Sequence, residues 1–203
     1  MKKLLCMAII LSGITTSQIA DAAARQFTVS ASVPVATDAT ITATRVLVAG
    51  NVFQDPVNSL SFGTLSFNTQ NGIWIPQHYF AIDVGVIGGT GTPNVTFNYG
   101  SQTNPPGQTN GLSVKSTATF VKVTGAIGNQ TETPLPAHPK QLLRDIAGEQ
   151  VIGSEFSGGF LRTYVGIYTG GDSGIDAAGG SPFTNADLPG DYQGTLTVTA
   201  LIP

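Results

Sequence analysis

Histidines, carboxylates and one tryptophan are the residues of this 203-residue chain whose types could do chemistry. The two histidines, His78 and His138, lie far apart in the sequence, and neither has a spacing typical of metal ligands. The chain has no Gly-x-Ser-x-Gly elbow, no Walker loop and no His-Glu-x-x-His motif. The sequence therefore predicts no enzymatic activity, no metal site and no cofactor.

Three other features allow a binding role, and each has a simpler interpretation. Asp172 and Asp176 would offer oxygens to calcium, but acidic residues in a glycine-rich loop are more often just solvated. Trp74 lies between two isoleucines, which favours core or inter-subunit packing over a ligand-stacking platform. Asp83 interrupts the strongest predicted strand, and we expect it to face outward, away from the core.

The first 24 residues are typical of a secretory signal peptide. Lys2 and Lys3 precede an apolar run over residues 4–11, and small residues predict cleavage after Ala22 or Ala24. The single cysteine, Cys6, lies inside this leader. The exported chain is therefore expected to fold without a disulfide, by packing and strand pairing alone.

Composition excludes several classes of partner. Removing residues 1–24 takes away Lys2, Lys3 and Asp21, which leaves 7 basic and 11 acidic residues and a net charge of −4. Because no basic cluster remains, we expect no nucleic-acid partner. Only 10% of the residues are charged, and 25 Gly and 12 Pro accompany many Thr, Ser and Val. This mixture favours strands joined by tight turns over helices.

The remaining chain predicts an all-β antiparallel sandwich in one domain. Short alternating segments, separated by turn residues and spaced about 8–15 residues apart, indicate seven to nine strands. A frame change near Arg45 suggests a bulge, and Asn71-Gly72 predicts a tight turn. Helical spacing occurs only over residues 140–147. The strands are expected at 39–49, 60–67, 73–75, 78–87, 94–100, 112–124, 150–156, 160–168 and 191–202.

The sandwich is preceded by one more alternating segment, residues 25–36. Period-two alternation places its apolar residues on one face of a strand, and Pro34 ends the run. The apolar residues are Phe27, Val29, Ala31 and Val33. At the other end, a second alternating set shares one face: Tyr192, Gly194, Leu196, Val198, Ala200 and Ile202.

These two ends resemble subunits of chaperone–usher pili. The segment Phe27-Thr-Val-Ser-Ala-Ser-Val-Pro34 resembles the N-terminal extension of the cysteine-free, colonization-factor type of pilin, known as the alternate class. The segment from Pro189 to Thr199, with its Gly-x-Tyr-x-Gly turn, resembles the final strand of pilins generally. Together the two segments cover about a sixth of the exported chain, and the middle aligns with nothing.

The resemblance implies an immunoglobulin-like sandwich that lacks its final strand and is completed by donor-strand complementation. Residues 1–24 would be the signal peptide, 25–36 the donor-strand extension and 37–203 the pilin domain. The extension would insert Phe27, Val29, Ala31 and Val33 into the groove of an identical or related subunit. Tyr192, Leu196, Val198, Ala200 and Ile202 would border the receiving groove, which an isolated chain would leave open.

The resemblance also implies the other partners and the location. A periplasmic chaperone would fill the groove first, and an outer-membrane usher would exchange it for the next subunit. The chain would then be a structural subunit of a cell-surface fimbrium that supports adhesion or biofilm formation, with a host or surface receptor as a further partner. Loops at 101–111, 125–147 and 169–190 make the chain longer than a plain major pilin, which leaves open whether it is a major or a minor subunit.

Two alternatives stay open. The first is a stand-alone secreted β-sandwich that binds carbohydrate or a surface through the 169–190 loop, with 25–36 an ordinary first strand paired in its own sandwich. The second is a β-sandwich hydrolase, which the missing nucleophile–base arrangement disfavours.

Overall fold

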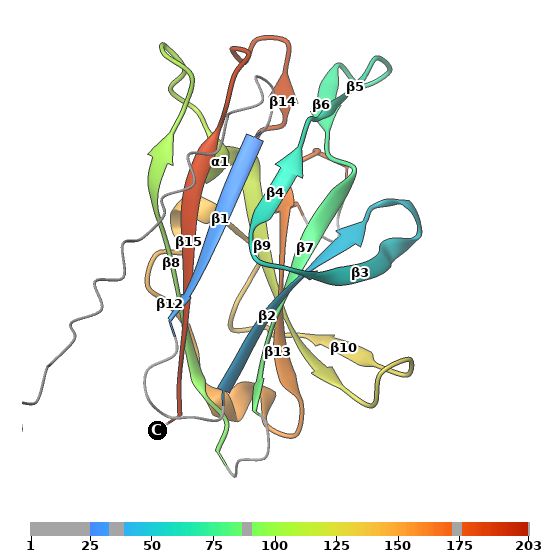
Figure 1. The fold of residues 1–203 in the computed structure, drawn as a ribbon, viewed down its shortest axis with the longest axis vertical. Helices are drawn as coiled ribbons and strands as arrows, with labels where there is room; N and C mark the ends of the chain where they lie inside the picture. Colours follow the sequence, from blue (N-terminus) through green and yellow to red (C-terminus); the bar gives the residue numbers. More distant parts are fainter. Residues whose placement is uncertain (1–24, 33–38, 87–90, 172–175, 203) are drawn as a thin grey trace, which may run out of the picture.

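The computed structural model describes residues 25–32, 39–86, 91–171 and 176–202, and for residues 25–32 it describes the backbone alone. It is an all-β sandwich of two main sheets, with a small third sheet at one end (Figure 1). Among the described residues, all strand pairs are antiparallel except one, β1 with β15. The predicted fold class is thus confirmed at the level of an all-β, largely antiparallel sandwich.

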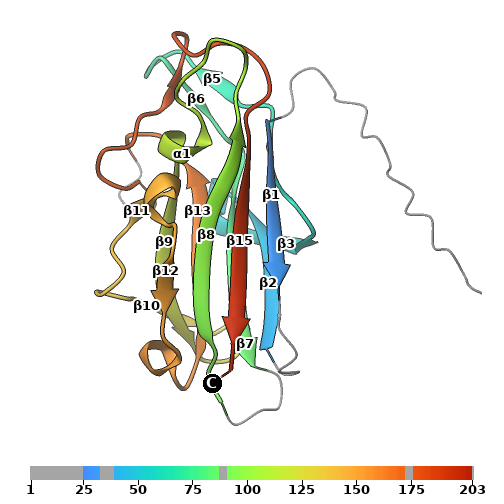
Figure 2. The ribbon, with the colours of Figure 1, turned by 90° about the vertical axis from the view of Figure 1, so that its left-hand side faces the viewer.

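The first sheet has the order β12-β8-β15-β1-β4, and Figure 2 shows β8, β15 and β1 running side by side along the long axis. Its strands are β1 (Arg25–Ser32), β4 (Leu60–Gly63), β8 (Asn94–Thr103), β12 (Glu149–Val151) and β15 (Gln193–Leu201).

The second sheet has the order β10-β9-β13-β7-β2-β3, with β11 also paired to β9. Its strands are β2 (Ala39–Leu47), β3 (Val52–Val57), β7 (His78–Val86), β9 (Ser116–Thr124), β10 (Thr131–Pro134), β11 (Gln141–Leu142) and β13 (Phe160–Ile167). The small sheet contains β5 (Ser66–Asn68), β6 (Ile73–Ile75) and β14 (Phe183–Thr184). The helical turns are α1 (Leu112–Lys115), η1 (Ala49–Asn51), η2 (Leu143–Asp145) and η3 (Gly153–Phe156).

The core lies between the two main sheets and is built by the alternating residues of their strands. In β7 the predicted inward residues Phe80, Ile82 and Val84 are fully buried. Tyr79 and Ala81, on the opposite face of β7, are buried too, because Val46 and Tyr164 pack against them in a second small cluster. The outer face of the second sheet is therefore partly covered, which the alternation of β7 does not reveal.

Several local predictions are confirmed. The pairing of β2 with β3 shifts register between Thr44 and Val46, which is the bulge expected near Arg45. The turn between β5 and β6 contains Gly72 at φ 68°, and its N–H donates to the carbonyl of Asn68 at 2.9 Å. A positive φ at this position favours glycine, as the Asn-Gly pair indicates.

Three segments differ from the prediction. Residues 150–156, expected as one strand, form the end of β12 and the turn η3. Residues 112–115 form the turn α1 before β9 starts, because the N–H groups of Val114 and Lys115 both donate to the carbonyl of Gly111 at 3.1 Å. Residues 140–147 form β11 and the single turn η2 in place of two helical turns. Apolar residues of this segment are still buried, as the spacing indicated: Leu142, Leu143 and Ile146.

The largest difference concerns the first strand. β1 pairs with β15 and β4 of its own chain, so the slot that we expected to be open in an isolated chain is occupied. This is the pairing that the stand-alone module predicts. A strand tethered to the same chain is present at a high effective concentration, which favours closure in cis when no other strand competes.

Candidate functional site

The candidate site is the slot between β15 and β4 in the first sheet, with β1 in it (Figure 1). β1 runs parallel to β15 over six paired residues, from Phe27 opposite Gly194 to Ser32 opposite Thr199. It runs antiparallel to β4 over three pairs, with a register shift between Arg25 and Gln26. Without β1, the backbone groups on one edge of β15 and one edge of β4 would lack these partners.

The walls of the slot are apolar. On β15, the predicted wall residues Leu196, Val198 and Ala200 are buried, and they alternate with half-buried threonines. On β4, Leu60 and Phe62 are buried. A strand that enters the slot therefore completes a hydrophobic layer as well as a hydrogen-bond ladder.

The other two predicted wall residues lie at the ends of this row. Tyr192 is fully buried just before β15, where its hydroxyl donates to the carbonyl of Leu188 at 2.7 Å and its ring packs on Phe183 at 4.9 Å. Ile202 is half-buried and follows the last residue of β15. The start of β15 is thus fixed by the contacts of Tyr192, and Ala200 is the last buried residue of the strand.

The predicted donor residues are placed by backbone register. Phe27, Val29 and Ala31 pair with Gly194, Leu196 and Val198, which are all buried. These are the positions that the alternating pattern assigns to the apolar set. The side chains of these three residues, and the whole of Val33, lie outside the described residues.

His78 contacts the backbone of β4, the side of the slot opposite β15. The sequence did not identify this strand as part of the slot. The Nε2 of His78 lies 2.7 Å from the carbonyl oxygen of Ser61, the central part of β4. Burial lowers the pKa of His78, despite the opposing hydrogen bond to the carbonyl of Ser61, and the charge of Arg45 lowers it further. A neutral ring that donates from Nε2 to the β4 backbone fits this environment. His78 thus has a structural role that links the two sheets.

His138 lies between two glutamates. Its Nδ1 contacts Glu149 and its Nε2 contacts Glu155 at 2.9 Å, while the imidazole is buried. Burial alone would lower the pKa of His138, but the hydrogen bonds and charges of Glu149 and Glu155 raise it overall. Because both ring nitrogens face carboxylates, the imidazolium form fits best, and it ties the loop after β10 to β12 and η3.

Asp83 faces outward, as expected, and is paired with Arg162. The guanidinium donates to both carboxylate oxygens, with Nε–Oδ1 and Nη2–Oδ2 distances of 2.7 Å. Arg162 also donates from Nη1 to Glu132 at 2.8 Å. Burial alone would lower the pKa of Arg162, but Asp83 and Glu132 raise it above its ordinary value. The pair joins β7 to β13 on the outer face of the second sheet.

The remaining candidates favour packing over chemistry. Trp74 is half-buried in β6, and its ring lies 5.0 Å from that of Phe67 in the neighbouring strand. Asp176 accepts hydrogen bonds from the N–H of Thr169 at 3.0 Å and from its hydroxyl at 3.3 Å. Asp172 lies outside the described residues. Within the described part of the chain, no group of three His, Cys, Asp or Glu side chains is arranged to hold a metal ion.

Sequence reasoning missed β4 as a wall and the partners of the charged residues. The alternation around Gly63 indicated a strand, but the pattern does not show which strand lies next to it. Glu149, Glu155 and Arg162 carry no local signal, because their partners are 11 to 79 positions away.

No helix in the described ranges is long and apolar enough to cross a membrane.

Comparison with known proteins gives no match, whether to a family model, to a curated protein or to a solved structure.

Proposed function

We propose that the chain is a structural subunit of a chaperone–usher-assembled fimbrium, polymerised by exchange of β1 between neighbouring copies. The observation that carries the proposal is the position of β1. It is the first strand of the described chain; without it β15 would become an edge of the sheet and β4 would lose the strand with which it pairs. In this proposal the domain is an immunoglobulin-like sandwich that lacks a last strand of its own, and β1 of one copy completes the next.

The direction of β1 favours exchange. In its own chain β1 forms its longer ladder, six pairs, in parallel with β15 and its shorter ladder, three pairs, in antiparallel with β4. Parallel ladders are slightly less stable per residue than antiparallel ones. A neighbour's strand that enters the slot in the opposite direction would pair antiparallel with β15, the strand with which it forms the longer ladder. Reversal would make the six pairs with β15 antiparallel and the three pairs with β4 parallel, so the balance of ladder types favours exchange when a neighbour's strand is available.

The same slot explains the partners of the proposal. When β1 leaves, apolar walls and two open strand edges are exposed, and such a surface aggregates unless it is covered. A periplasmic chaperone would cover it, and an outer-membrane usher would replace the chaperone by the next subunit. Export by the predicted leader, followed by its removal, frees the N-terminal end of β1 for this exchange.

One observation favours the second candidate, a stand-alone secreted binding module. In this candidate β1 is a permanent member of its own sheet, as it is paired in the single chain. The two candidates differ in one respect, namely whether β1 of one copy ever occupies the slot of another.

Inserting one alanine between Thr28 and Val29 is expected to block fibre assembly. Because side chains alternate with a period of two, the insertion moves part of the apolar set to the opposite face of the strand. Electron microscopy of the cell surface and heat-stable ladders on gels measure assembly. The matched control is one alanine inserted after Gly128, in the exposed turn between β9 and β10, which should leave fibres intact. Normal fibres from the Thr28 insertion would contradict strand exchange.

A further inference from the structure

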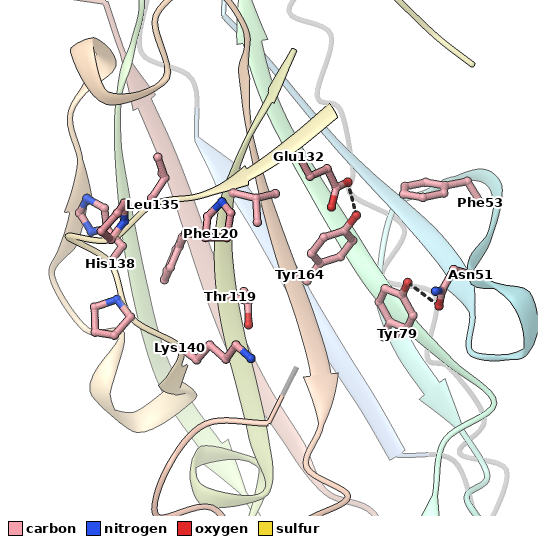
Figure 3. A pocket seen from close by; sticks show the side chains of 14 residues that line it. Asn51, Phe53, Tyr79, Thr119, Phe120, Glu132, Leu135, His138, Lys140 and Tyr164 are labelled. Atoms are coloured by element: carbon pink, nitrogen blue, oxygen red, sulfur yellow. Dashed lines mark hydrogen bonds between the residues drawn. The ribbon is translucent and has the colours of Figure 1, made fainter. Parts of the chain in front are cut away.

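A cavity of about 750 Å³ lies on the outer face of the second sheet, away from the slot (Figure 3). It opens between β3 on one side and β10 with the loop after it on the other, and β7, β9 and β13 form its floor. Cavities of roughly 300–1,000 Å³ are typical of small-molecule sites. We infer from its lining that this cavity binds a neutral saccharide.

Aromatic rings form one side of the cavity. Tyr79 and Tyr164 pack edge to face, with 5.6 Å between their ring centroids, and Phe53 lies near them at the rim (Figure 3). Phe53 is 43% exposed, and no other phenylalanine whose side chain the structure describes is among the exposed large hydrophobic residues. Sugar rings present a face of C–H groups, and exposed aromatic rings in a concave site offer such a face a matching surface.

Polar groups lie beside these rings at fixed positions. The Tyr79 hydroxyl donates to Oδ1 of Asn51 at 3.2 Å, and the Tyr164 hydroxyl donates to Oε1 of Glu132 (Figure 3). The Glu132 side chain is 35% exposed, and its other oxygen, Oε2, accepts no hydrogen bond from the described residues. It is therefore free to accept hydrogen bonds from the hydroxyls of a sugar.

The Arg162 guanidinium fixes the position of Glu132 by donating a hydrogen bond to its Oε1 at 2.8 Å. Arg162 is itself fixed by Asp83 and lies 4.6 Å below the ring of Phe53. One buried cation thus orients both the carboxylate and the aromatic rim of the cavity. Groups that are fixed before binding lose little conformational entropy when a ligand arrives.

The charges around the cavity favour a neutral ligand. The lining contains the carboxylate of Glu132 and the ammonium group of Lys140, and Arg162 pairs with Glu132 from beneath. His138, also in the lining, lies between its two glutamates. Neither sign dominates, so an anion or a cation gains little, whereas a ligand with hydroxyls and an apolar face matches the rings and the carboxylate. The inference does not depend on strand exchange, because the slot and the cavity are on opposite sheets.

The test is saturation-transfer NMR on the full exported chain, with methyl α-mannoside, methyl β-galactoside and methyl β-glucoside as probes. This measurement observes the probe and works whether the protein is a monomer or a fibre. We expect saturation transfer to the ring C–H protons of at least one probe. Phe53→Ala should weaken binding of that probe by about ten-fold, the effect of losing one well-placed aromatic contact.

The matched control is Val52→Ala, because Val52 is the preceding residue of β3, is similarly exposed at 51% and does not line the cavity. It should bind as the unaltered chain does. Glu132→Gln, which keeps the shape of the side chain, should also weaken binding, and it replaces Phe53→Ala if that variant fails to fold. Absence of transfer to all three probes, or equal transfer in Phe53→Ala and Val52→Ala, would overturn the inference. Binding of a proline-rich peptide at Phe53, together with no binding of the three sugars, would also overturn the inference.

Discussion

Deletion of residues 25–35 is expected to abolish fibres while leaving export intact. The deleted chain has no strand to donate, but it keeps the open edge of β15 and the buried residues Leu60 and Phe62 of β4, so we expect it still to accept one. When the deleted chain is mixed with the unaltered chain, it should therefore be added to a growing fibre but should not allow a further subunit to be added after it. The fibres should become shorter in proportion to its amount. Electron microscopy of co-expressing cells measures fibre number and length.

The same deletion should destabilise the isolated chain by more than about 3 kcal/mol, because it removes the ladders of six and three pairs that β1 forms with β15 and β4. A control for the loss of sequence alone is replacement of the polar positions Gln26, Thr28 and Ser30 by alanine. That variant keeps the apolar set and should still form fibres. Polymerisation of the deleted chain by itself would refute the proposed function.

Asp83→Ala is expected to lower the free energy of unfolding by about 3 kcal/mol, since it leaves the buried guanidinium of Arg162 with one carboxylate partner in place of two. Arg162 is only 4% exposed and cannot recover its hydration without opening the face of the sheet. Urea denaturation measures the change, which is a large share of the stability of a domain of this size.

The control is Asp145→Ala. Asp145 pairs with Arg144 at the surface, where both side chains are about half exposed, at 55% and 52%. Exposed pairs contribute roughly 0–1 kcal/mol, so this variant should change stability little. Equal effects of the two substitutions would mean that the Arg162 cluster does not hold β7 to β13 as the geometry indicates.

The sequence predicts the strands well and their neighbours poorly. The alternation in β7 and β15 identifies the inward residues, because burial on one face of a strand requires a period of two. The same alternation in residues 25–32 fixes which positions are apolar. It does not say whether the strand beside it belongs to the same chain or to another, since both arrangements bury the same set. Hence the closed single chain and the proposed fibre agree equally with the pattern.

The cavity and the two charged clusters could not be predicted for a different reason. Phe53, Glu132 and Tyr164 come from three strands that meet only when the second sheet forms and its outer face is partly covered. Each residue alone is typical of a strand surface. His138 looked isolated in the sequence because its partners, Glu149 and Glu155, approach it only through the loop after β10.

Cross-linking between β1 and β15 tests most directly whether one copy completes another. Ser30 pairs with Thr197 near the middle of the slot, and both belong to the polar sets of their strands. The only native cysteine, Cys6, lies in the predicted leader, so Ser30→Cys and Thr197→Cys together give a clean pair. Ser30 and Thr197 both lie near the middle of the ladder, so a short bismaleimide should still bridge them when a neighbour's strand enters in the opposite direction.

After cross-linking of material assembled at the cell surface, denaturing gels separate the two accounts. Strand exchange predicts a ladder of covalent multimers that retain the Ser30–Thr197 link between different copies. A single monomer band with the same link inside one chain would contradict the account.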